Sequence, residues 1–339
     1  MSEPYYVDDL VTLFHGDALT LAPVLETGSV QTIVTSPPYF GLRDYGHPDQ
    51  LGAEGSVGEY VANLVAVFGA LRSALSDDGT LWLNLGDSYS TYAANRGAST
   101  SFSRNDPLPE VARGSGFSGD RSAKNLLGVP WRVAFALQDD GWVLRSDIIW
   151  AKPNPMPESV TDRPTKAHEY LFLLSKSERY HYDADAIKER GSTATGNVTD
   201  LDSLAGRNYD HRADGLTVGK GEAHTSGTRS GGNLSKAYAG VDWTVVGRNR
   251  RTVWTIPTEP FPGAHFAVMP TALVKPCILA GCPTGGTVLD PFTGSGTVAV
   301  VALENGCAFV GCELNPAYVD IAKKRVGNVT PATLLRGAS

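Results

Sequence analysis

Short apolar runs alternate with polar turns and with helically spaced segments along most of the chain. Runs rich in apolar and β-branched residues predict strands over 10–14, 30–35, 80–85, 143–150, 170–174, 287–289 and 309–312. Apolar residues at three- and four-residue intervals predict helices over 58–76, 127–139, 269–281, 297–305 and 316–326. Strands that alternate with helices predict an α/β fold with a doubly wound, mostly parallel sheet.

Two long segments interrupt this alternation. Residues 91–125 are polar and rich in Gly, Ser and Arg, and residues 191–240 contain ten glycines and few large apolar side chains. Neither composition supplies much hydrophobic core, and both are typical of loops or linkers. Both segments are therefore expected to lie outside the core.

The charge balance sets a condition on any polyanionic partner. The formal net charge is −7, so a nucleic acid would have to be bound through local patches. Residues 91–132 carry six Lys or Arg against three acids, and residues 247–251 read GRNRR. These segments are candidates for DNA contacts, with an ordinary solvated surface as the alternative.

The chain lacks the sequence features of a secreted or membrane protein. No apolar run reaches the length of a membrane span, and the opening MSEPYYVDDL lacks the features of a signal peptide, so a cytoplasmic protein is expected. The four cysteines, Cys277, Cys282, Cys307 and Cys312, form no C-x-x-C pair. Their spacing favours reduced, buried thiols over a metal site.

A glycine-containing turn joins a predicted strand to a predicted helix at 290–296, which reads DPFTGSG. Gly294 and Gly296 lack Cβ atoms, so the backbone can turn tightly and a ligand can lie against it. Glu313 ends the next predicted strand, where a carboxylate accepts hydrogen bonds from ribose hydroxyls in folds of this kind. A nicotinamide dinucleotide and S-adenosylmethionine both fit this pattern, and a plain glycine turn is the third alternative.

A second motif, Ser36-Pro37-Pro38-Tyr39, directly follows the predicted strand 30–35. Two successive prolines fix the backbone and carry no N–H, so the loop is stiff and offers hydrogen-bond acceptors. An amino group on a planar base needs such acceptors, because they hold its hydrogens and direct the nitrogen lone pair toward a methyl donor. Tyr39 offers an aromatic face for stacking. A proline-rich turn that merely ends a strand is the alternative.

Together these motifs resemble the family of DNA methyltransferases that modify exocyclic amino groups. Ser36–Tyr39 resembles the catalytic motif of that family, residues 290–296 its S-adenosylmethionine loop, and Glu313 its ribose-binding acid. Asp17 matches the position that such enzymes place near the cofactor adenine. The catalytic motif precedes the cofactor loop, which resembles the permuted class called β.

The resemblance implies a Rossmann-like methyltransferase fold that divides into three parts. Residues 1–185 form its catalytic half, 186–246 a target-recognition insert, and 247–339 its cofactor-binding half. The resemblance also implies S-adenosylmethionine as the cofactor, double-stranded DNA as the partner, and no metal; no motif indicates a companion restriction nuclease. The implied cofactor-binding residues are Asp17, Asp290, Phe292, Gly294, Gly296 and Glu313. The implied catalytic residues are Ser36, Pro37, Pro38 and Tyr39.

The modified atom is expected to be N4 of cytosine, because the catalytic motif begins with Ser36 where adenine-modifying relatives more often carry Asp or Asn. N6 of adenine is the alternative. Three other classes remain open: a methyltransferase for RNA or a protein amide, a nicotinamide dehydrogenase, and a non-catalytic DNA-binding protein.

Several further residues have two interpretations. Asp87 either assists at the site or is a turn residue. His168 and Glu169 precede a predicted strand and are expected to be structural. Residues 152–157 either line the base pocket or form a surface loop.

Overall fold

The computed structural model describes residues 3–42, 47, 49–90, 122–189, 248–260 and 268–330. The chain divides into two units, one formed by Met1–Ile187 together with Arg251–Ser339 and the other by Lys188–Arg250. These limits lie close to those of the 186–246 insert that the resemblance implies. Most of the second unit, and most of the basic segment 91–132, lie outside the described residues.

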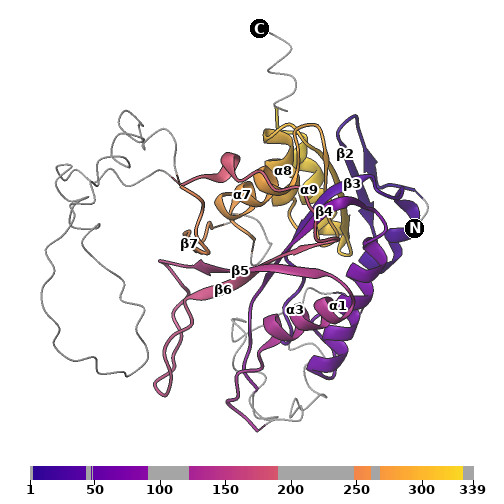
Figure 1. Cartoon of the computed structure of the whole chain (residues 1–339). Helices are drawn as coiled ribbons and strands as arrows, with labels where there is room; N and C mark the ends of the chain where they lie inside the picture. The colour runs from indigo at the N-terminus through magenta and orange to yellow at the C-terminus, as the bar shows by residue number, and fades with distance from the viewer. Residues whose placement is uncertain are drawn as a thin grey trace, which may run out of the picture. The chain divides into compact units, whose positions relative to one another are not determined.

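The described strands of the larger unit form one sheet in the order β1-β2-β9-β8-β3-β4-β6-β5-β7 (Figure 1). The strands are β1 (Tyr6–Val7), β2 (Val11–His15), β3 (Val30–Thr35), β4 (Leu75–Leu85), β5 (Val143–Ala151), β6 (His168–Ser175), β7 (Val253–Thr255), β8 (Thr287–Asp290) and β9 (Ala308–Glu313). Neighbours pair in parallel except at β1–β2, β4–β6 and β6–β5. The predicted mostly parallel sheet is therefore confirmed.

Helices cover both faces of this sheet (Figure 1). The helices are α1 (Val57–Leu71), α3 (Val129–Asp139), α7 (Thr271–Gly281), α8 (Thr297–Glu304) and α9 (Pro316–Val326), with short 3₁₀ turns η1 (Ala18–Thr20), η2 (Ala22–Val24) and η4 (Asp185–Ile187). One core cluster contains α1 and α3 side chains, and the other contains side chains from α7, α8 and α9. The fold is thus doubly wound, as predicted.

Alternation along the central strands explains the two cores. Ile33 on β3 is buried with α1 and α3, whereas its neighbour Val34 is buried with α7, α8 and α9. Trp82 on β4 likewise faces the second cluster, and Leu81 and Leu83 on either side of it face the first. Successive side chains of a strand point to opposite faces, so a strand buried on both sides reads as a continuous apolar run.

The boundary between α1 and β4 differs from the prediction. The helix expected over 58–76 ends at Leu71, and the strand expected over 80–85 begins already at Leu75. Val30 of β3 pairs with Leu75 of β4, but the next pair is Thr32 with Thr80. The register between the two strands therefore shifts at this point. Asp78 and Gly79 therefore lie within an irregularity of β4.

Among the described residues, no helix combines the length and hydropathy needed to cross a membrane. All four cysteines are buried and free, as expected for reduced thiols.

Candidate functional site

Four neighbouring parallel strands end at one cavity. The loops after β2, β9, β8 and β3 all contribute to its lining, with Gly16–Ala18, Glu313–Asn315, Asp290–Ser295 and Ser36–Tyr39. The cavity is open to solvent and encloses roughly 1030 Å³, part of it solvent space. In open α/β sheets ligands bind at the carboxyl ends of the strands. The structure therefore brings the two sequence motifs together, although they lie far apart in the chain.

Asp290 is the most buried acid of the cavity, with 2% of its surface exposed. Its Oδ1 accepts hydrogen bonds from the Thr35 hydroxyl at 2.6 Å and from the Phe292 N–H at 3.0 Å. Burial raises the pKa of Asp290 to about 7, although these two hydrogen bonds oppose the increase. A buried carboxyl group whose pKa is raised in this way is a candidate partner for a cationic ligand.

Glu313 is fixed at the end of β9 by backbone donors. The Gly294 N–H donates to its Oε2 and the Asn315 N–H donates to its Oε1, each at 2.8 Å. Burial raises the pKa of Glu313. Each carboxylate oxygen has a second lone pair, so the fixed carboxylate can also accept hydrogen bonds from ligand hydroxyls. Gly294 itself has φ +52°, which only glycine adopts readily.

Two further expected cofactor residues also line the cavity. Asp17 begins η1, and its Oδ1 accepts a hydrogen bond from the Leu19 N–H at 2.7 Å. Phe292 packs edge-on against Phe68 of α1, with 6.4 Å between the ring centroids. Both side chains are therefore held in place from within the fold.

Gly296 differs from the other expected cofactor residues, because it is not among the residues that line the cavity. It begins α8 with φ +80°, and a Cβ there would lie 3.0 Å from both the Cα and the Cβ of Ala322 on α9. The missing side chain therefore allows α8 and α9 to approach each other. The sequence interpretation, in which Gly296 makes room for the cofactor, does not match this geometry.

Replacement of Gly296 should consequently act on folding. We expect Gly296→Ala to lower the free energy of unfolding by about 1–3 kcal/mol, because the new Cβ adds backbone strain and displaces Ala322. Thermal unfolding of the variant against wild type measures this effect. Unchanged stability together with lost cofactor affinity would restore the original interpretation.

A residue that the sequence interpretation missed holds the glycine loop. Arg325, in the last turn of α9, donates from one guanidinium nitrogen to the Ser295 carbonyl, the Ser295 hydroxyl and the Thr297 hydroxyl at 2.9–3.0 Å. Ser295 and Thr297 both line the cavity. The only sequence signal was a basic residue near the end of a predicted helix, which is common at helix ends.

The loop after β3 is anchored beneath the cavity. The Pro38 carbonyl accepts a hydrogen bond from the buried Tyr60 hydroxyl at 2.8 Å. The Tyr39 ring packs so closely on Gly86 that a Cβ at position 86 would lie 2.5 Å from it. Stacking of a base on Tyr39 stays a prediction, since one side of the ring already contacts Gly86.

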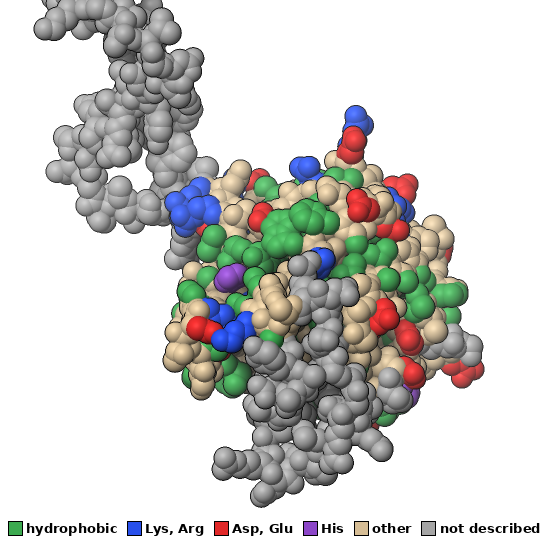
Figure 2. Space-filling view, turned by 90° about the horizontal axis from the view of Figure 1, so that it is seen from below, with side chains coloured by type: hydrophobic (Ala, Val, Ile, Leu, Met, Phe, Trp, Pro, Cys, Tyr) green, Lys and Arg blue, Asp and Glu red, His purple; other side chains and the backbone are tan. Residues whose placement is uncertain are grey.

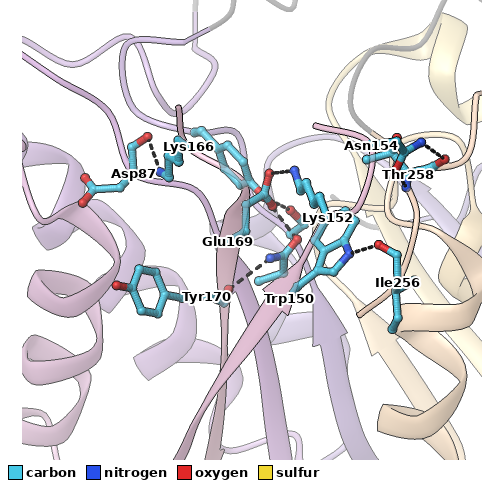
Figure 3. Close-up of polar contacts among 12 residues, drawn as sticks. Asp87, Trp150, Lys152, Asn154, Lys166, Glu169, Tyr170, Ile256 and Thr258 are labelled. Atoms are coloured by element: carbon cyan, nitrogen blue, oxygen red, sulfur yellow. Dashed lines mark hydrogen bonds and ion pairs between the residues drawn. The ribbon is translucent and has the colours of Figure 1, made fainter. Parts of the chain in front are cut away.

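Polar contacts connect this loop to strands β5 and β6. The Ser36 hydroxyl donates to the Tyr39 hydroxyl at 3.3 Å, and the Tyr39 hydroxyl donates to Glu169 Oε2 at 2.6 Å. The other oxygen of Glu169 accepts from the Lys152 ammonium group (Figure 3). Glu169, expected from sequence to be merely structural, therefore contacts the catalytic motif directly.

Asp87 caps a helix. Its Oδ1 accepts hydrogen bonds from the N–H groups of Ser88 and of Val129, the first residue of α3, both at 2.9 Å. The Lys166 ammonium group donates to the Asp87 carbonyl at 2.8 Å (Figure 3). Between the two interpretations of Asp87, this geometry favours the structural one.

The described basic residues do not form a single patch on the face shown in Figure 2, where Lys and Arg side chains occur in separate places among acidic and uncharged ones. Arg248 of the second unit pairs with Glu189 at 3.0 Å. The clusters expected at 91–132 and 247–251 are only partly within the described residues, so their DNA contacts stay a prediction.

The lining suits a cationic nucleoside better than a dinucleotide. The carboxyl group of Asp290 lies in the cavity at the start of the glycine turn, where a dinucleotide would place its pyrophosphate, and it would repel that charge. Glu313 could accept hydrogen bonds from a ribose of either cofactor. S-adenosylmethionine carries an ammonium group and a sulfonium centre together with ribose hydroxyls. Its charges and hydroxyls therefore match the carboxyl groups that are present.

Comparison with known proteins agrees with S-adenosylmethionine as the ligand of this cavity. Residues 30–324 match the family model of the N6/N4 methyltransferases, described as DNA methylase. The chain is 45% identical to the type II methyltransferase M.Cfr9I of Citrobacter freundii, over 96% of this chain and 90% of that protein. It is 43% identical to the type II methyltransferase M.SmaI of Serratia marcescens, over 92% of this chain and 89% of that protein.

Solved structures share the fold. The PvuII DNA methyltransferase, described as cytosine-N4-specific, aligns with a TM-score of 0.59 at 17% identity and covers 99% of this chain and 93% of its own. A putative DNA modification methylase from Thermus thermophilus, solved in complex with S-adenosyl-L-methionine, aligns with a TM-score of 0.52 at 19% identity, over 93% of this chain and 94% of its own.

Proposed function

Since the chain belongs to the N6/N4 family of DNA methylases, we propose that it methylates the N4 amino group of cytosine in double-stranded DNA. It is an S-adenosylmethionine-dependent DNA methyltransferase, and the finer assignment concerns the base, the atom and the residues. The observation that carries this assignment is Ser36, which stands first in the catalytic motif and lines the cavity beside the acidic cofactor loop.

Asp17, Asp290, Phe292, Gly294 and Glu313 would hold the cofactor, since all of them line the cavity. Bound S-adenosylmethionine supplies a methyl group on a cationic sulfur, which is already an activated leaving group. The remaining task of the chain is to extrude the base from the duplex and to hold its amino nitrogen toward the methyl group. A nitrogen–carbon bond would then replace the sulfur–carbon bond, and the methylated nitrogen would release one proton to water.

Ser36 performs the second task as a hydrogen-bond acceptor. Its Oγ accepts one hydrogen of the amino group, which draws the nitrogen lone pair out of conjugation with the ring. Pro37 and Pro38 keep the loop rigid during the transfer, and the Tyr60 hydroxyl fixes the Pro38 carbonyl by a hydrogen bond. The amino group of adenine would meet the same acceptor, so adenine N6 is the second candidate; the Ser in place of Asp or Asn favours cytosine.

Sequencing of DNA from cells that express the protein tests the assignment, provided that the method distinguishes N4-methylcytosine from N6-methyladenine at each position. We expect N4-methylcytosine at one short recurring sequence. Cells that express Ser36→Ala serve as the control and should lack the mark. A recurring N6-methyladenine mark would replace cytosine by adenine in the assignment.

We further propose that residues 186–246 choose the target sequence. Their support is their position between the two motif-bearing parts and their shortage of core-forming residues. Within the second unit, Glu189 and Arg248 exchange backbone hydrogen bonds of 2.9 Å in both directions. The stretches of chain that flank residues 190–247 therefore lie side by side.

This geometry allows a clean deletion. Residues 190–247 can be replaced by a short glycine-rich turn, because Glu189 and Arg248 are already paired. We expect the shortened protein to bind S-adenosylmethionine with unchanged affinity in calorimetry but to lose methylation of the recurring sequence. Continued methylation of the same sites would reduce the segment to a linker.

A further inference from the structure

A chain of hydrogen bonds leads from Ser36 away from the cavity into strand β6. The Ser36 hydroxyl donates to the Tyr39 hydroxyl at 3.3 Å, and Tyr39 reaches Glu169 Oε2 at 2.6 Å and Asn84 Oδ1 at 3.1 Å. Glu169 lies on β6 and is joined to Lys152 (Figure 3). Their side chains are only 15% and 18% exposed, so solvent competes little with these contacts.

Glu169 and Asn84, the two partners of Tyr39 away from the cavity, fix the direction of these hydrogen bonds. A carboxylate accepts hydrogen bonds and donates none. The Asn84 amide is oriented by its own Nδ2, which donates to the Tyr170 carbonyl at 3.0 Å and thereby turns Oδ1 toward Tyr39. Tyr39 has one hydroxyl proton and meets acceptors on this side, so its proton points at them, toward Glu169 at the shorter distance.

The consequence reaches Ser36. Because the Tyr39 proton is directed to Glu169, the Tyr39 oxygen is an acceptor toward Ser36, and the Ser36 proton points at Tyr39. A hydroxyl has one proton and two lone pairs, so both lone pairs of Ser36 remain for the cavity side. If these hydrogen bonds ran in the opposite direction, the Ser36 proton would face the hydrogens of the amino group.

We propose that Glu169 is a positioning residue for the methyl transfer, which holds the Ser36 hydroxyl in the orientation that accepts from the substrate amino group. The inference rests on the proposed role of Ser36 and is independent of whether the amino group belongs to cytosine or adenine. Glu169 acts through Tyr39 and Ser36.

Lys152 completes the arrangement. Its ammonium group contacts the second oxygen of Glu169 and lies 4.3 Å from the centre of the Trp150 ring on β5. Trp150 is itself fixed, since its indole N–H donates to the Ile256 carbonyl at 2.8 Å (Figure 3). A paired cation thus neutralises the partly buried carboxylate and fixes which of its oxygens faces Tyr39.

Glu169→Gln tests this role with almost no change of shape. If the new amide accepts from Lys152 through its oxygen, its NH₂ group faces Tyr39 and donates to it. The direction of the hydrogen bonds from residue 169 through Tyr39 to Ser36 is then reversed. We expect methyl incorporation from labelled S-adenosylmethionine into unmodified genomic DNA to fall roughly 10- to 100-fold in kcat, as for loss of one hydrogen bond to a charged group. The dissociation constant of S-adenosylmethionine should stay within about twofold, because the group acts on the base side of the cavity.

The decisive readout is the same substitution in a Ser36→Ala background. If Glu169 acts only through the Ser36 hydroxyl, Glu169→Gln adds less than about twofold to the loss caused by Ser36→Ala, which is non-additivity of a shared chain. Tyr39→Phe should behave likewise and provides a second test if Glu169→Gln unfolds. Glu158→Gln is the matched control. Glu158 pairs with Arg163 in the connection between β5 and β6 and does not contact Tyr39, so this variant should keep wild-type turnover.

Two outcomes would overturn the inference: full turnover in Glu169→Gln, or an equal loss in the wild-type and Ser36→Ala backgrounds, which indicates a general structural role. Full turnover in Ser36→Ala alone would instead contradict the proposed function of Ser36. The two failures are therefore distinguishable.

Discussion

Ser36→Ala should lower the turnover number about 100-fold or more while leaving the affinity for S-adenosylmethionine within about twofold of wild type. In the proposed mechanism the lost hydroxyl is the acceptor that prepares the nucleophilic nitrogen, so its effect should appear in the chemical step. The proposed cofactor contacts come from the loops after β2, β8 and β9 and should remain in place. Single-turnover methylation and calorimetry with the cofactor measure the two quantities separately.

Ser29→Ala provides the control for this prediction. The Ser29 hydroxyl donates to the Glu26 carbonyl at 2.7 Å, and Ser29 is not among the residues that line the cavity. Its loss should leave both quantities unchanged. Wild-type turnover in a folded Ser36→Ala protein would remove Ser36 from the reaction, and an equal loss of cofactor affinity would move it to the cofactor site.

Asp290→Asn should weaken cofactor binding and stabilise the unliganded protein at the same time. The Asn side-chain oxygen can still accept from Thr35 and Phe292, so the local hydrogen bonds are kept. What disappears is the buried carboxylate, whose pKa of about 7 stands against an ordinary value of 3.8. At about 1.4 kcal/mol per unit of pKa, ionisation of Asp290 costs the folded state on the order of 4 kcal/mol.

The pH dependence has a definite sign. Because the folded-state pKa of Asp290 is raised, the folded state binds its proton more tightly than the unfolded chain does. Its contribution to stability is therefore fully present below about pH 4 and is lost as the pH rises toward 7 and above. The gain in melting temperature of Asp290→Asn over wild type should be largest near pH 8 and small near pH 4.

Cofactor affinity should change in the opposite direction. A cationic ligand binds the ionised carboxyl better, so wild-type affinity should fall as the pH drops below 7, and at pH 8 Asp290→Asn should bind S-adenosylmethionine about 10- to 100-fold more weakly. Calorimetry at pH 6 and 8 on both proteins checks this. If Asp290→Asn is both less stable and equally able to bind the cofactor, Asp290 is a structural residue.

Much of the fold was predictable because its strands and helices carry strong local patterns. The predicted limits of β3 and α9 coincide with Val30–Thr35 and Pro316–Val326. β3 is a run rich in β-branched residues between turns. α9 begins at Pro316, a residue favoured at the first helical position, directly after Asn315, whose side chain caps the helix. Where such signals were strong, sequence alone placed the elements.

The errors occurred where tertiary pairing decides. The start of β4 at Leu75 depends on pairing with Val30, which no local pattern contains. β7 is a three-residue edge strand, Val253–Thr255, that exists through its pairing with β5. Both lie outside what hydrophobic periodicity within one segment can indicate.

The candidate site divides in the same way. The two motif loops were predictable from Pro and Gly at fixed positions, and their meeting at one cavity followed from the rule that parallel strands end at the same edge. Glu169 and Arg325 were not predictable, because their partners lie 130 and about 30 residues away in the chain. The role of Gly296 could not be decided from sequence, because the same missing Cβ serves a ligand or a neighbouring helix equally well.

The most direct measurement is nucleoside analysis by mass spectrometry of unmodified genomic DNA that the purified protein has methylated with S-adenosylmethionine. We predict N4-methylcytosine as the product, formed about 100-fold or more slowly when the Ser36→Ala variant is used at the same concentration. N6-methyladenine without N4-methylcytosine would contradict the base assignment, and N4-methylcytosine formed equally well by the variant would contradict the role of Ser36.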